Sequence, residues 1–159
     1  MNPQTRLHAG LVTVSVLLSA CASLENVVSA PNVSLRNVHV QEVAFDKQTF
    51  LLAFDVTNPN PFPLPIKSIS YSVRLDGHHF AGGEAASAFT VPSGSDGEFA
   101  ISVDLNLLKT APELLFIVRD AARRDIPYAL EGKLAIDIPY TKPISFESNG
   151  DIRLLSAAY

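Results

Sequence analysis

Residues 55–66 read DVTNPNPFPLPI, and this stretch decides the fold of the chain. Proline occupies every second position from 59 to 65. Each proline lacks an N–H group and holds φ near the polyproline value, so the stretch cannot form a central strand. Asn58 and Asn60 each precede a proline, which moves them out of the helical region, and their short amides can bond to backbone groups that the prolines leave unpaired. The stretch predicts a rigid, extended crossing at a sheet edge.

The segments on both sides of this crossing have the pattern of β-strands. Large apolar residues recur with a period of two, which places them on one face of a sheet. They are Phe50, Leu52, Phe54 and Val56 before the crossing, and Ile69, Tyr71, Val73 and Leu75 after it.

The order of these residues resembles the signature of the type 2 late embryogenesis abundant proteins, also called the water stress and hypersensitive response domain. In that family a strand leads into Asn-Pro-Asn, a proline-rich turn and a further strand. The signature positions here are Asn58, Pro59, Asn60 and Pro61. The resemblance covers residues 35–155. It implies an immunoglobulin-like or fibronectin-like antiparallel β-sandwich and a non-enzymatic role in stress tolerance.

The remaining sequence predicts seven or eight strands in total and one helix over about 111–124. Thr110 and Glu113 fit a capping box, with Pro112 in the first turn. Arg119, Arg123 and Arg124 lie near the helix end, where the helix dipole favours cations. The expected apolar face consists of Leu114, Leu115, Val118, Ala121 and Ala122.

Local irregularities are also expected within the strands. The apolar parity shifts twice over 33–45, which indicates a bulge or two short strands. Asp76-Gly77 predicts a two-residue hairpin, because both residues tolerate positive φ. Gly82-Gly83 suggests a bulge or a sheet corner, and Gly132 marks a break or bulge in a later strand.

The N-terminus has the features of a lipoprotein signal peptide over residues 1–20. Arg6 precedes a short apolar run, 11–18, which has the length of a secretory signal and is too short to span a bilayer. Residues 18–21 read LSAC and resemble the bacterial lipobox, in which the cysteine is acylated. Cys21 is the only cysteine, so it cannot form an internal disulfide. The alternatives are an ordinary cleaved signal or a short hydrophobic anchor.

This assignment sets the expected organisation and location. Residues 21–32 form a lipidated N-terminus and tether, and residues 33–159 form the β-sandwich domain. By resemblance to enterobacterial lipoproteins, Ala22 after the cysteine directs the protein to the outer membrane, facing the periplasm. Acyl chains on Cys21 would hold it on the membrane without a spanning helix.

Composition limits the partners. The chain has 159 residues, 47% hydrophobic and 18% charged, which suits one folded domain rather than a disordered chain. Loss of residues 1–20 removes only Arg6 among the charged residues, leaving 11 basic and 16 acidic residues and a formal net charge of −5. Nucleic acid is not an expected partner. The expected partners are the membrane, through Cys21, and stress-unfolded proteins or lipid, with the protein itself a monomer.

The sequence contains no recognisable catalytic, metal or cofactor motif. His78 and His79 are adjacent, so in a strand they point to opposite faces. No cysteine or histidine spacing completes a zinc site, and neither a serine-hydrolase elbow nor a phosphate-binding loop is present. We therefore expect no enzyme activity, no metal and no cofactor.

An apolar cleft beside the helix is the basis of the alternative function. The aromatic residues are expected mainly in the core, and some of them could instead line a cleft between helix and sandwich. Arg119, Arg123 and Arg124 would then lie at its mouth and contact a lipid phosphate or a partner. The first hypothesis is an envelope protein that protects against desiccation or osmotic stress. The alternative is a lipid- or partner-binding lipoprotein of an envelope transport or assembly system. The aromatic residues in question are Phe45, Phe50, Phe54, Phe80, Phe89, Phe99, Phe116 and Tyr128.

Overall fold

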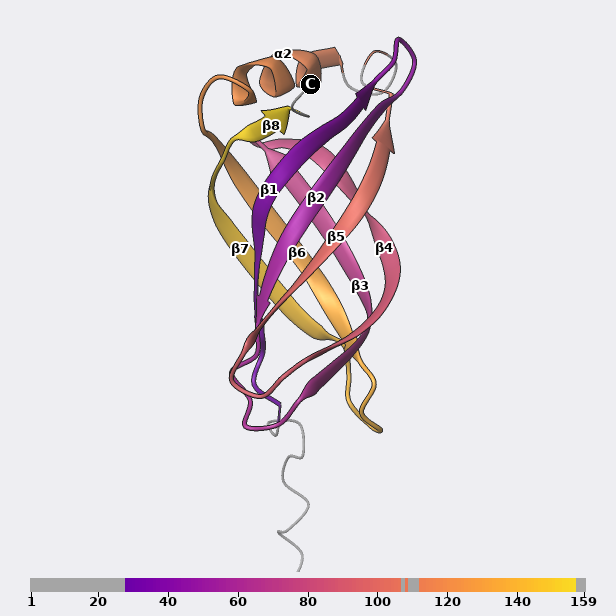
Figure 1. Cartoon of the computed structure of the whole chain (residues 1–159), viewed down its shortest axis with the longest axis vertical. Coiled ribbons are helices and arrows are strands. Elements are labelled where there is room, and N and C mark those ends of the chain that lie inside the picture. The colour runs from indigo at the N-terminus through magenta and orange to yellow at the C-terminus, as the bar shows by residue number, and fades with distance from the viewer. Residues whose placement is uncertain (1–27, 107, 109–111, 157–159) are drawn as a thin grey trace, which may run out of the picture.

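The computed structural model describes residues 28–106, 108 and 112–156, which form two four-stranded sheets packed face to face (Figure 1). One sheet has the order β5-β2-β1-β8 and the other the order β4-β3-β6-β7. The strands are β1 (Asn32–Val43), β2 (Gln48–Thr57), β3 (Leu64–Leu75), β4 (His78–Val91), β5 (Asp96–Leu105), β6 (Ile126–Ile136), β7 (Ile144–Ile152) and β8 (Leu154–Ser156), and the helix is α2 (Pro112–Ala121).

The strand pairing confirms the expected antiparallel sandwich. Every pairing is antiparallel except that of β1 with β8, in which 38–40 run parallel to 154–156. The proline-rich stretch leaves β2 in one sheet and enters β3 in the other, so it is a crossing between sheets, as predicted. The predicted place at a sheet edge is wrong, because β2 and β3 are both inner strands of their sheets. A second crossing, residues 92–95, returns the chain from β4 to β5.

Two of the predicted irregularities are confirmed. Asp76 and Gly77 have φ values of 48° and 78° and form the tight turn between β3 and β4. β1 shifts register twice against β2, between Leu35 and Asn37 and between Val40 and Glu42. These two bulges explain why the apolar parity of this strand changes twice.

The other two predicted irregularities are wrong. β4 runs through Gly82-Gly83 without interruption, and its register shift near the hairpin falls at Phe80 instead. Phe80 is buried, so the bulge turns a large apolar side chain into the core. β6 pairs with β7 in continuous register through Gly132.

The core lies between the sheets and contains most of the expected aromatic residues. Phe50 and Phe80 pack edge to face with ring centroids 5.1 Å apart, and Phe54 stacks on Phe99 at 4.8 Å. Two of the expected aromatic residues are not in the core: Phe45 is 88% exposed and Phe116 is 62% exposed.

α2 covers one end of the sandwich (Figure 1). It ends at Ala121, earlier than the expected boundary at 124, and residues 122–124 follow as a turn and bend. The buried residues are Leu114, Ile117 and Ala121, so the inward face is turned relative to the expected one and Ala122 is exposed. The expected N-cap, Thr110, lies outside the described residues.

Candidate functional site

The signature residue Asn58 is fully buried at the start of the first crossing. Its Nδ2 atom lies within hydrogen-bonding distance of three backbone oxygens, those of Phe62, Val91 and Pro92, at 2.9 to 3.1 Å. Its backbone N–H donates to the Ser95 oxygen at 2.9 Å. One side chain therefore connects the first crossing to the end of β4 and to the start of the second crossing.

Asn60, the second signature asparagine, is also buried and is held by the first. The Oδ1 atom of Asn58 accepts from the backbone N–H and from Nδ2 of Asn60, at 3.0 and 2.9 Å. The backbone oxygen of Asn60 accepts from Gly94 N and Ser93 Oγ, both at 3.1 Å. The intervening prolines have no N–H to offer, so the amides provide the bonds that the backbone cannot make.

The Asn60 side chain binds the segment that precedes β1. Its Oδ1 accepts from Ser29 N at 2.7 Å and its Nδ2 donates to Ser29 O at 3.0 Å. The primary amide thus pairs with Ser29 as a neighbouring strand would. The predicted tether over 21–32 therefore overlaps the fold, because its last residues are already fixed to the sandwich. We call Asn58, Asn60 and their partners Ser29 and 91–95 the asparagine clamp.

The asparagine clamp lies at the end of the sandwich where the described chain begins. The described chain starts at the end opposite α2, and the connection between β6 and β7 lies at the same end as this start (Figure 1). The expected lipidation residue, Cys21, lies outside the described residues. In the sequence, Cys21 precedes Val28, the first described residue, by seven positions.

Three arginines were expected to contact lipid or a partner, and all three lie at the α2 end of the sandwich: Arg119, Arg123 and Arg124. Arg119 and Arg124 each approach Asp120 at 3.5 Å, and all three arginine side chains are exposed. The Arg119 guanidinium also lies 5.3 Å from the Phe116 ring centroid, in the arrangement of a cation–π contact. This end therefore presents cations beside an exposed aromatic ring.

Exposed apolar side chains gather at the same end, a feature that the sequence analysis missed. Phe116 lies on α2, and Val43 and Phe45 lie at the tip of the β1–β2 hairpin, at the same end of the sandwich as α2 (Figure 1). Both phenylalanines were among the aromatic residues expected mainly in the core, although Phe116 was not part of the expected apolar face of the helix. The signal for Phe45 was its place next to the polar turn 46–48, at the end of an irregular strand. The exposed large apolar residues of the described chain are Val43, Phe45, Leu108, Phe116, Tyr140 and Leu155.

Three shallow hollows lie elsewhere on the surface. Two, of about 380 and 400 Å³, lie along β6 between β3 and β7 and are lined mainly by serine, glutamate and other polar side chains. The third, of about 370 Å³, lies at the clamp end between Val28 and the β6–β7 connection. None of these three hollows is lined by a residue of α2, so the expected cleft beside the helix does not coincide with any of them.

The search for other sites covers the described part of the chain only. Residues 28–106, 108 and 112–156 contain no group of three or more side chains able to hold a metal ion. His78 Nδ1 lies 2.9 Å from the Asp76 oxygen within its own hairpin. No helix among these residues is long and apolar enough to cross a membrane.

The fold and the clamp define the class: an antiparallel β-sandwich whose two crossings are tied by a buried asparagine pair. The protein-family model for late embryogenesis abundant protein matches residues 53–150, which include both asparagines. The chain therefore belongs to the type 2 late embryogenesis abundant family.

Two plant proteins are similar over most of the chain. A desiccation protectant protein, a Lea14 homolog of Glycine max, is 30% identical over 131 residues, covering 78% of this chain and 81% of that protein. A desiccation-related protein LEA14 of Arabidopsis thaliana is 28% identical over 132 residues, covering 80% and 83%.

The solved structures agree with the fold. A solution structure of an Arabidopsis thaliana protein superposes with a TM-score of 0.60 and 25% identity, covering 83% of this chain and 86% of that one. A second solution structure, described as that of a late embryogenesis abundant protein, gives a TM-score of 0.50 at 22% identity, covering 79% and 72%, and supports the fold alone.

Proposed function

We propose that this protein is a lipid-anchored, non-enzymatic envelope protein that protects envelope components under desiccation or osmotic stress. The anchor is acylated Cys21, and the location is the periplasmic face of the outer membrane. The family and the names of its plant relatives, a desiccation protectant and a desiccation-related protein, support the stress role. The LSAC sequence at 18–21 supports the anchor.

The observation that carries this proposal is the opposite placement of tether and exposed apolar residues. The asparagine clamp fixes the tether at one end, while Phe45 and Phe116 are exposed at the other (Figure 1). An anchored molecule would therefore present its apolar end away from the membrane. Exposed apolar side chains on a folded, soluble surface favour contact with other apolar surfaces. Proteins that lose water and partly unfold expose such surfaces, and the apolar end would contact them.

The test is survival of a bacterial strain that lacks the gene and carries a plasmid copy. Wild-type protein should restore survival after drying and after osmotic shock. The double variant Phe45→Ser/Phe116→Ser should restore little, because the apolar end is lost while the core is intact. Phe89→Leu, a conservative change of a partly buried ring, is the matched control and should restore survival fully.

A second variant tests the anchor. Cys21→Ser should leave the protein in the soluble periplasmic fraction and reduce its protection. Equal survival of the deletion strain and the wild type in both stresses would refute the protective role. If Cys21→Ser protects as well as the wild type, the protective role stands and only the need for the lipid anchor is refuted.

The arrangement at α2 favours a second candidate, a lipid- or partner-binding lipoprotein of an envelope transport or assembly system. Phe116 beside Arg119 combines an apolar surface with a cation, and Arg123 and Arg124 are exposed nearby. Such a surface suits an acidic partner or a lipid phosphate. Native mass spectrometry of exported residues 22–159 separates the two candidates: a stoichiometric lipid or protein supports the second, and a mass without ligand favours the first.

A further inference from the structure

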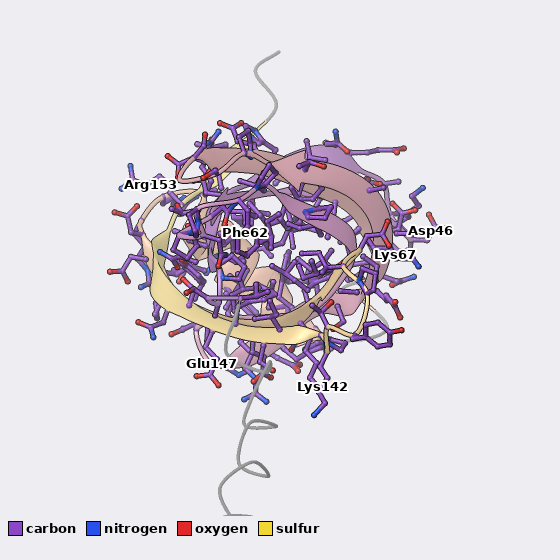
Figure 2. All side chains as sticks on the ribbon, turned by 90° about the horizontal axis from the view of Figure 1, so that it is seen from below. Asp46, Phe62, Lys67, Lys142, Glu147 and Arg153 are labelled. Carbon is purple, nitrogen blue, oxygen red and sulfur yellow. The ribbon has the colours of Figure 1, made fainter. Side chains whose placement is uncertain are left out.

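The connection between β6 and β7, which we call the clamp-side loop, comprises residues 137–143. It packs beside the first described residues: Val28 and Ala30 line the 370 Å³ hollow together with 140–144. Figure 2 views the molecule from this end and shows Lys142 pointing away from the body. The loop and the start of the tether therefore form one surface.

The loop holds Tyr140 in a fixed, outward position. Thr141 N donates to the Ile138 oxygen at 3.2 Å, and Thr141 Oγ1 donates to the same oxygen at 2.6 Å, closing a tight turn. Pro139 and Tyr140 occupy the centre of this turn, where φ of Tyr140 is 65°. That conformation favours glycine or asparagine, yet the position carries a fully exposed aromatic ring. A positive φ at an exposed tyrosine in a tight turn indicates that the side chain itself has a function.

The tether places this ring close to the acyl group. Val28 lies seven positions after Cys21, a separation that spans at most about 25 Å when the chain is extended. Ser29 cannot move away from the sandwich without breaking both bonds to Asn60. The clamp-side loop therefore lies within one short tether length of the lipid anchor, whereas α2 lies at the far end of the sandwich (Figure 1).

We propose that the clamp-side loop is a second membrane contact, with Tyr140 in the lipid headgroup layer of the anchoring bilayer. Tyrosine is enriched at membrane interfaces because its ring is apolar and its hydroxyl is polar. The clamp-side loop contains two charged residues, Asp137 at its start and Lys142 near its end, and the cation Lys142 suits lipid phosphates. Acyl anchors commonly need a further signal for a stable, oriented attachment. This inference rests on the proposed lipid anchor, and it gives the domain a defined orientation on the membrane.

The absence of tryptophan from the chain makes a direct test available. Tyr140→Trp introduces one fluorescent probe at the loop, and Phe45→Trp introduces one at the opposite end. Residues 21–159, which keep the whole described fold, are coupled through the Cys21 thiol to a maleimide-headgroup lipid. The vesicles contain phosphatidylethanolamine and phosphatidylglycerol, either plain or with brominated acyl chains that quench nearby tryptophan.

The expected result is an emission shift to shorter wavelength and at least twofold stronger quenching for Tyr140→Trp than for Phe45→Trp. Pro143→Trp provides a second position in the loop and should behave like Tyr140→Trp. Equal quenching at the two ends, with either loop probe, would overturn the proposal.

The chemical coupling keeps this test independent of the proposed acylation. If Cys21 is not acylated in cells, the coupled protein still reports whether the loop meets the bilayer. Acylation itself is measured separately, from the mass of the N-terminal peptide of protein isolated from the envelope.

Discussion

Asp55 of β2 and Glu98 of β5 are direct partners across two antiparallel strands, and both are held by Arg36 of β1. Arg36 is the extra residue of the first β1 bulge, and its Nε donates to Asp55 Oδ2 at 3.1 Å. Like charges placed directly opposite in a sheet repel each other. The bulge therefore supplies a cation at the position where three strands would otherwise present only two carboxylates.

The first prediction concerns the pH dependence that this contact creates. The hydrogen bond and charge of Arg36 hold the pKa of Glu98 below its ordinary value of 4.5. The stabilisation is therefore complete above that value and is lost as the pH falls through the lowered pKa of the folded state. Urea unfolding from pH 7 to pH 3 should show a larger loss of stability for wild type than for Glu98→Gln.

Glu147→Gln, which removes an exposed glutamate of β7 in the other sheet, is the matched control. Its stability should follow the wild-type pH dependence. Identical pH profiles for Glu98→Gln and wild type would contradict the role assigned to Arg36.

The second prediction concerns the asparagine clamp. Asn58→Ala removes the donor shared by three buried or partly buried backbone oxygens and the acceptor for Asn60, and should lower the free energy of unfolding by about 3 kcal/mol. Asn60→Ala should cost about 2 kcal/mol and also accelerate hydrogen exchange at the Ser29 amide. Asn149→Ala, at an exposed position of β7, should change neither quantity. Unchanged exchange at Ser29 in Asn60→Ala would show that the tether is held by other contacts.

The third prediction concerns Gly132 at the centre of β6. A Cβ atom there would lie 2.1 Å from the Ser70 oxygen and 2.6 Å from the Phe146 ring, and neither the backbone nor the packed ring can withdraw easily. Gly132→Ala should destabilise the protein by about 3 kcal/mol. Gly82→Ala, whose Cβ would meet its nearest atom at 3.0 Å, should cost clearly less. Thermal unfolding of both variants checks this order.

The fourth prediction concerns the strained turn of the clamp-side loop. Asparagine tolerates positive φ better than tyrosine, so Tyr140→Asn should raise the free energy of unfolding by about 0.5 to 1 kcal/mol. Tyr140→Ala keeps a Cβ atom in the same conformation and should give no comparable gain. A gain of equal size in both variants would mean that loss of the exposed ring, and not relief of backbone strain, is responsible.

Much of the fold could be predicted from local sequence because the signals are local. The proline run predicted a crossing, Asp76-Gly77 predicted a hairpin, and the parity shifts predicted bulges in β1. Each of these depends on the allowed dihedral angles or side-chain alternation of adjacent residues.

The remainder depends on neighbours distant in the chain. The amide of Asn60 was expected to bond to nearby backbone, and its partner Ser29 lies 31 residues away. Helical spacing alone did not identify Ile117 as buried, because tertiary packing decides which face of α2 turns toward the sandwich. Phe45 and Phe116 are large and apolar, yet their positions at the α2 end leave them exposed. Residue type did not reveal this, since burial requires a partner surface.

The parallel pairing of β1 with β8 has a consequence for the synthesis of the chain. Within the described residues, 38–40 of β1 obtain their outer neighbour only from 154–156, which are made much later than β1. Until those residues emerge, one border of β1 offers free backbone groups to any other chain. A product that stops before residue 154 would keep this border of β1 unpaired, and we expect it to pair with strands of other chains and aggregate.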